Sequence, residues 1–186
     1  SRTPGKIRGP APTPHQHREE ILSQLGSSQP NYIPLLTHTD VRNALEGVRV
    51  LDLCIEIAGP SLGRTLAQFG ADVIKIDKPD LEKRQFLTVL NNDVNQGKRS
   101  LLLNLKTEEG RDVFWRLLEN TDVVLQSYRA GKLEKLGLGY NEVRKRKPEI
   151  IYASVNAYGS PGPWEERPAH DPVTQSATGM ALRFGG

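Results

Sequence analysis

Cysteine and long apolar runs are scarce in this 186-residue chain, and each scarcity excludes a class of protein. The single cysteine, Cys54, excludes an internal disulfide framework and agrees with a reducing compartment. No apolar run reaches the roughly 18 residues that a membrane-spanning helix needs. The formal net charge of +3 is too small to indicate a nucleic-acid-binding protein. We therefore expect a globular cytoplasmic protein with no membrane or nucleic-acid partner, or a mitochondrial or peroxisomal one in a eukaryote.

The amino end combines few acids with many prolines. Four prolines fall within the first fourteen residues, and no acid precedes Glu19. A transit peptide is also poor in acids, but these prolines would break its amphipathic helix. His15 and His17 have a spacing that metal ligands can take, but they lack acidic partners, so we expect them to be solvated. We interpret residues 1–45 as a tail or linker with two short helices, one over 17–26 and one over 40–45, capped by Asp40.

From residue 46 onward, apolar strands alternate with amphipathic helices. This alternation predicts an α/β fold with a doubly wound, mostly parallel, Rossmann-like sheet. Ligands bind such sheets at the carboxyl ends of the strands, near the switch in strand order. The first turn after a strand, residues 54–60, lacks the G-x-G-x-x-G pattern, so a nicotinamide or flavin cofactor is not expected. The expected strands are 48–54, 71–77, 100–105, 122–128 and 150–155, and the expected helices are 61–69, 107–118 and 140–147.

Asp171 stands out because it follows a turn-rich stretch and lies between His170 and Pro172. Taken alone, it fits a carboxylate on a loop or a capping residue at a helix start. Its surroundings add more, because the chain from Gly47 to Gly179 resembles the first half of the family III CoA-transferases. The resemblance is carried by Gly47–Leu53 with Ala58–Pro60, Gly70–Ile76, Gly97–Thr107, Glu134–Tyr140 and Arg167–Gly179.

The resemblance implies a set of site residues. Asp171 would be the covalent nucleophile, and Gln175 would line the same site. Backbone amides near Ala58–Pro60, or a glycine-rich loop beyond Gly186, would stabilise the oxyanion. No metal is implied. Coenzyme A, bound as acyl-CoA, would contact Lys78, Leu103, Lys106, Tyr128 and Lys135, with Leu103 and Tyr128 flanking the adenine.

The chain departs from the family pattern in several of these segments. Ser127 stands where the family often has Asn, Lys135 stands where it has Arg, and Asn95-Gln96 replaces a usual Asn-Arg pair. The segment from Gly9 to Gly26 is similar to the ending of a family unit. We therefore expect residues 46–186 to form the N-terminal part of a large domain, an incomplete unit of an interlocked-dimer fold that is inactive alone. A homodimer or a tandem intramolecular pair would complete it.

The function implied is transfer of CoA from an acyl-CoA to a small carboxylic acid through an anhydride and a thioester on Asp171. A racemase of 2-methylacyl-CoA thioesters is an alternative, since such enzymes share the His170-Asp171 pair. No histidine lies between His38 and His170, where a racemase would place its second one. A CoA-dependent lyase and a non-catalytic CoA-binding half of a tandem protein remain further alternatives.

Overall fold

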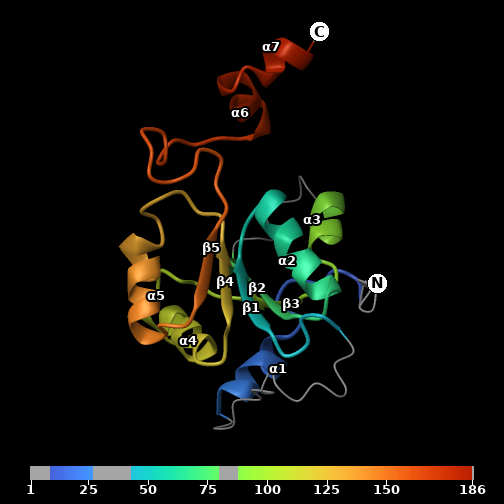
Figure 1. Cartoon of the computed structure of the whole chain (residues 1–186). Coiled ribbons are helices and arrows are strands. Elements are labelled where there is room, and N and C mark those ends of the chain that lie inside the picture. The colour runs from blue at the N-terminus through green and yellow to red at the C-terminus, as the bar shows by residue number, and fades with distance from the viewer. Residues whose placement is uncertain (1–8, 27–42, 80–87, 186) are drawn as a thin grey trace.

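The structure, a computed structural model, describes residues 9–26, 43–79 and 88–185. A five-stranded parallel sheet lies at its centre, with the strand order β3-β2-β1-β4-β5 (Figure 1). Leu51 in β1 lies opposite Ile74 in β2 and Val124 in β4, so the strand order switches direction at β1. This confirms the predicted doubly wound α/β class. The strands are β1 (Arg49–Leu53), β2 (Asp72–Asp77), β3 (Arg99–Leu102), β4 (Val123–Gln126) and β5 (Ile151–Ser154).

Helices flank the sheet close to the predicted positions. The sequence analysis predicted neither α3 nor α7, and it left open whether Asp171, where α6 begins, lies on a loop or at a helix start. It placed the start of α2 at Ser61, although the helix already begins at Ala58. Of the helix expected over 40–45, residues 40–42 lie outside the described residues and 43–45 form a turn. The helices are α1 (Arg18–Ser23), α2 (Ala58–Gln68), α3 (Thr88–Val94), α4 (Glu108–Leu118), α5 (Tyr140–Arg146), α6 (Asp171–Ala177) and α7 (Met180–Phe184), with 3-10 turns η1 (Gln24–Gly26) and η4 (Glu134–Leu136).

Successive side chains along the strands point to opposite faces of the sheet, so the core has two layers. Leu51 and Leu53 of β1 face a larger layer that includes Phe114 of α4. Val50 and Cys54 face a smaller layer under α2. Figure 1 shows α4 and α5 on one side of the sheet and α2 and α3 on the other. Because both faces carry helices, the residues inside β1, β2 and β4 are buried whichever way they point, whereas no residue of the edge strand β5 is buried.

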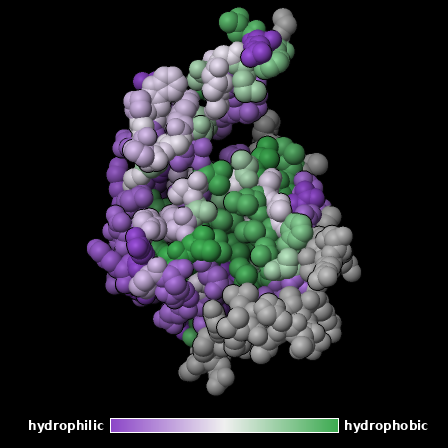
Figure 2. Space-filling view, in the orientation of Figure 1, coloured by the Kyte–Doolittle hydropathy of each residue, from purple (hydrophilic) through white to green (hydrophobic). Residues whose placement is uncertain are grey.

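In the part of the chain that the structure describes, apolar side chains are exposed on the side of the sheet that bears α2 and on the helices α6 and α7. Figure 2 shows apolar residues gathered on the side of the sheet that bears α2. Exposed members of this side include Ile57, Leu62 and Phe69, and Ile151 of the edge strand β5 is 61% exposed. The second surface belongs to α6 and α7, which lie beyond the end of the sheet in Figure 1. Among the described residues, no helix has the length and apolar character needed to cross a membrane.

The amino-terminal segment lies along the outer edge of β3. Nδ1 of His17 accepts the backbone N–H of Ser100 at 3.1 Å, and Nδ1 of His15 accepts that of Leu102 at 3.0 Å. The backbone N–H of His17 also donates to the Ser100 carbonyl at 3.3 Å. The prediction of solvated histidines is therefore wrong, because these two rings occupy hydrogen-bonding groups that an edge strand would otherwise leave open.

Acidification is expected to weaken this contact, because a ring nitrogen that accepts a hydrogen bond cannot carry a proton. Burial and the charge of Arg18 lower the pKa of His15, outweighing Glu19. Because the pKa of His15 is lowered in the folded chain, its hydrogen bond with Leu102 stabilises the fold fully above about pH 6.5. This stabilisation is lost as the pH falls through the lowered pKa of His15. We expect the Leu102 amide to lose up to about 1 kcal/mol of protection between about pH 7.5 and pH 5, measured by hydrogen exchange corrected for intrinsic rates.

A matched control is His15→Asn, whose side-chain oxygen can accept the same hydrogen bond without titrating. Protection of Leu102 in this variant should not change with pH. Equal protection of Leu102 at both pH values in the wild-type protein would contradict the prediction.

Candidate functional site

The candidate site lies at the carboxyl edge of the sheet, beside the switch in strand order. The turn from Cys54 to Pro60 leaves β1 there and leads into α2. Because β1 lies between β2 and β4, this turn is flanked by the segments that follow those strands. Lys78 follows β2 and Tyr128 follows β4. The topology therefore brings the β1–α2 turn and two of the predicted CoA residues to one place.

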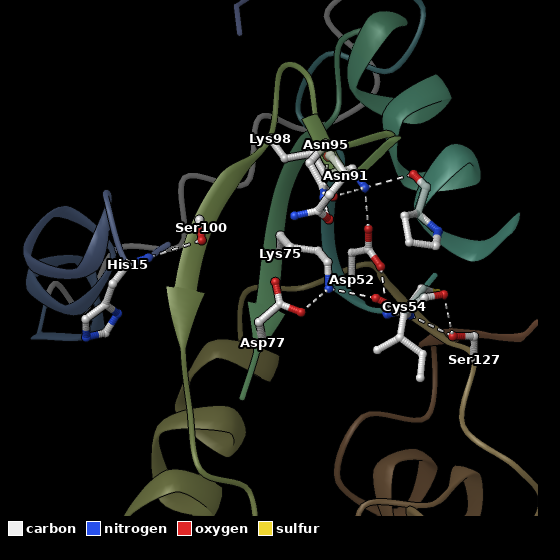
Figure 3. Close-up of polar contacts among 12 residues, drawn as sticks. His15, Asp52, Cys54, Lys75, Asp77, Asn91, Asn95, Lys98, Ser100 and Ser127 are labelled. Atoms are coloured by element: carbon white, nitrogen blue, oxygen red, sulfur yellow. Dashed lines mark hydrogen bonds and ion pairs between the residues drawn. The ribbon is translucent and has the colours of Figure 1, made fainter. Parts of the chain in front are cut away.

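Three side chains, one in β2, one just before β3 and one just after β4, hold the β1–α2 turn (Figure 3). The Ser127 hydroxyl accepts the Ile55 N–H at 2.8 Å. Lys75 Nζ donates to the Cys54 carbonyl at 2.7 Å, and Lys98 Nζ donates to the Pro60 carbonyl at 2.8 Å. Two of these contacts hold the peptide group between Cys54 and Ile55, at the start of the turn, and the third holds Pro60, at its end.

The turn is tight and carries backbone strain. Glu56 has a φ of 66°, in the left-handed region that non-glycine residues occupy at a cost of about 1–3 kcal/mol. Gly59 packs so closely on the turn that a Cβ there would lie 2.5 Å from Cys54 Cβ. A Cβ at Gly63, one turn later in α2, would lie 2.4 Å from Asp52 Oδ2. Helix α2 thus approaches β1 through glycines, and its first turn has little freedom to move.

A buried charge network lies beneath the turn. The side chains of Asp52 and Lys98 are both 0% exposed and lie 2.7 Å apart. Lys98 Nζ also donates to Asn95 Oδ1 at 3.0 Å, and Lys75 Nζ donates to Asp77 Oδ1 at 2.7 Å. Burial lowers the pKa of Lys98 despite Asp52, whereas Asp52 and Asp77 outweigh burial and raise the pKa of Lys75. Two lysines and two carboxylates leave the network neutral, as burial requires.

Cys54 is the thiol at this turn, and a thiol can be a nucleophile. Burial, followed by the charge of Asp52, raises the pKa of its thiol well above the usual range. A thiol becomes a nucleophile only as the thiolate. The thiol is fully buried and stays protonated, so it is not a candidate for attack on a substrate.

The structure brings two of the predicted CoA-binding residues into contact. Lys78 Nζ lies 6.0 Å from the centre of the Tyr128 ring. The backbone of Tyr128 is fixed because its N–H donates to Gln126 Oε1 at 2.7 Å. Leu103 is 8% exposed and belongs to the larger core layer, against which Tyr128 packs. These residues come from the ends of three different strands.

The other predicted residues lie farther along the chain after the same strands. Lys106 is exposed in the turn between β3 and α4, and Lys135 is exposed on η4 after β4. Asp171 begins α6, where it is exposed and accepts a 2.6 Å hydrogen bond from Gln175 Nε2. The N-cap of α6 is His170, so the alternative interpretation of Asp171 as a helix-capping residue is wrong. Its role as a nucleophile stays a prediction.

The sequence analysis missed the buried network. The sequence does indicate such a network, because Asp52 and Lys75 are charged residues within otherwise apolar strands. A buried parallel strand tolerates a charge only where the charge has a partner. The partners could not be predicted, because Lys98 is 46 positions away from Asp52 in the sequence. Among the described residues, no group of three or more His, Cys, Asp or Glu side chains could hold a metal ion.

Comparison with known proteins decides the family. Residues 45–186 match CoA-transferase family III. The chain belongs to this family. Among its family III relatives, Probable fatty acyl-CoA transferase Rv3272 of Mycobacterium tuberculosis is 41% identical over 146 residues, covering 73% of this chain and 37% of that protein. Succinyl-CoA:mesaconate CoA-transferase of Haloarcula marismortui is 39% identical over 153 residues, covering 74% and 39%.

Solved structures share the fold. A crystal structure of Rv3272 matches with a TM-score of 0.68 at 40% identity, covering 75% of this chain and 40% of that one. A CAIB/BAIF family protein from Brucella suis matches with a TM-score of 0.67 at 35% identity, covering 74% and 39%. This family III chain therefore spans about two fifths of the length of the relatives it matches.

Proposed function

We propose that this chain supplies the CoA-binding edge and the nucleophile of an enzyme that transfers CoA from an acyl-CoA to a small carboxylic acid. The observation that carries the proposal is the contact of Lys78 with Tyr128 beside the β1–α2 turn, at the switch point of a family III sheet. Switch points of this kind are where doubly wound sheets bind ligands. The relatives named for CoA transfer support the same activity.

The chemistry of CoA suits the groups at this edge. CoA carries a 3′-phosphate and a pyrophosphate, which cationic side chains on loops can bind by charge-assisted hydrogen bonds. Lys78, Lys106 and Lys135 supply such cations after β2, β3 and β4. The half-buried Tyr128 ring offers a surface to the adenine, whereas Leu103, 8% exposed, offers only a small part of its side chain. CoA is a substrate here, and the proposed reaction uses no metal.

The proposed reaction proceeds through two kinds of acyl intermediate on Asp171. A carboxylate oxygen attacks the thioester carbonyl, the C–S bond breaks, and the CoA thiolate leaves behind a mixed anhydride. The thiolate then attacks the Asp171 carbonyl and releases the donor acid, which gives an aspartyl-CoA thioester. The acceptor carboxylate repeats the sequence in reverse, takes the CoA, and restores Asp171. No oxidant, reductant or net proton is required.

Covalent trapping tests this proposal in the complete protein. The protein is incubated with an acyl-CoA and quenched with hydroxylamine, which attacks the aspartyl thioester, displaces CoA and leaves a hydroxamate. Peptide mass spectrometry should find the hydroxamate on Asp171. Its absence, with exchange of the substrate α-proton, would favour a racemase-like reaction instead. Its absence with CoA bound and no turnover would favour a non-catalytic CoA-binding half.

A further inference from the structure

We propose that Lys75, Lys98 and Ser127 are positioning residues for CoA transfer. They hold the β1–α2 turn in the shape against which the thioester is attacked, and they do so without touching the substrate. This inference rests on the proposed function, because it concerns the geometry of the same site. It also assigns a role to the buried charge network, which the proposed reaction itself does not use.

The first support is that three anchors hold backbone groups at both ends of the turn (Figure 3). Lys75 comes from β2 and holds the Cys54 carbonyl at 2.7 Å. Lys98 immediately precedes β3 and holds the Pro60 carbonyl at 2.8 Å. Ser127 follows β4 and holds the Ile55 N–H at 2.8 Å, while its hydroxyl lies 3.4 Å from the Ile55 carbonyl. The three anchors thus come from β2, from the residue before β3 and from the residue after β4, and each holds a different backbone group.

The second support is that the turn would not keep this shape unaided. Glu56 sits at a φ of 66°, which a free chain avoids. Such a conformation persists where the surroundings over-determine it. The backbone N–H groups of Ala58 and Gly59 belong to the first turn of α2 and have no partner within the helix. Their direction toward the carboxyl edge is set by the turn that precedes them.

The third support is the nature of the anchors. A buried ion pair contributes little net stability, and an apolar pair of similar volume often serves a core equally well. An apolar pair could not donate to the Pro60 carbonyl, whereas the Lys98 ammonium does so while it is bound by Asp52 and Asn95. The charged network therefore supplies hydrogen bonds to the turn that simple packing could not supply.

Ser127 allows a test that does not endanger the fold, because its side chain is only half-buried. In the complete protein we would compare Ser127→Ala and Ser127→Thr by kcat, by KM for acyl-CoA, and by the rate of adduct formation on Asp171. Since a displacement of about 1 Å can cost up to about a hundredfold, we expect Ser127→Ala to lower kcat at least about tenfold with KM changed less than about threefold. Ser127→Thr keeps the hydroxyl and should restore kcat.

The lysine anchors are tested by Asp52→Asn/Lys98→Gln, which removes both charges together and shortens the donor beyond reach of Pro60. We expect the same loss of kcat with a cooperative thermal transition. Ser23→Ala, which removes an exposed hydroxyl bonded only within α1, serves as the control with unchanged kinetics. If the double variant fails to fold, the comparison of Ser127→Ala with Ser127→Thr still tests the positioning role.

The outcomes separate the two proposals. A wild-type adduct on Asp171 together with unchanged kcat in Ser127→Ala would overturn the positioning role alone. A rise in KM without a fall in kcat would overturn it too, because it would show a loss of binding rather than of geometry. No adduct in the wild-type protein would overturn the proposed function, and the positioning role with it.

Discussion

Asp171→Asn is expected to lower the rate of CoA transfer by at least about a thousandfold, the order of loss seen when an enzyme's covalent nucleophile is removed. The amide cannot attack a thioester, so neither the anhydride nor the aspartyl-CoA thioester can form. The fold should survive, because Asp171 is exposed and an Asn oxygen can still accept the hydrogen bond from Gln175. We expect the free energy of unfolding to change by less than about 0.5 kcal/mol.

The measurement is kcat for CoA transfer in the complete protein, alongside thermal unfolding. Asp171→Ala should be equally inactive, and slow activity in the Asn variant alone would indicate deamidation back to Asp. Gln175→Leu removes the neighbour of the nucleophile but not the nucleophile itself, so it should retain covalent adduct formation. A wild-type rate in Asp171→Ala would exclude this residue as the nucleophile.

The strands could be predicted because their apolar runs are short and bounded by turn residues. Parallel strands covered on both faces depend mainly on such runs, and β1, β2, β4 and β5 all lie within the predicted ranges. Thr107 could also be predicted to open α4, and its side chain does accept the Gly110 N–H at 3.2 Å. Helix α3 was missed because residues 88–94 are mostly polar and short, without a clear apolar stripe.

Less of the site than of the sheet could be predicted from the sequence. The edge at which the CoA residues should gather follows from strand order, and the contact of Lys78 with Tyr128 agrees with it. The hydrogen bonds of His15 and His17 to β3 could not be predicted, because their partners lie more than 80 positions away in sequence. Long-range pairing of this kind is set by tertiary packing, which no local pattern encodes. The division of the chain at residue 45 and the dimeric or tandem assembly stay predictions.

Lys98→Met is expected to destabilise the chain by about 3–5 kcal/mol, the loss typical of breaking one side of a buried ion pair. Methionine fills a similar volume but leaves the buried Asp52 carboxylate without the cation that lies 2.7 Å from it. The Asn95 oxygen and the Pro60 carbonyl also lose their donor. Lys145→Met, on the exposed face of α5, should change the free energy of unfolding by less than about 0.5 kcal/mol. Denaturant unfolding of both variants measures the difference.

Adding Asp52→Asn to Lys98→Met separates the cost of the stranded charge from the cost of lost packing. The Asn side chain is nearly isosteric and can still accept the Cys54 N–H, which Asp52 now holds at 2.9 Å. Lys75 and Asp77 would remain as a balanced pair. We therefore expect the double variant to recover at least about half of the stability lost in Lys98→Met. Lys98→Met alone could cost less than about 1 kcal/mol only if Asp52 reached water or another cation. In that case the network would not hold the β1–α2 turn from a water-free interior, as its geometry indicates.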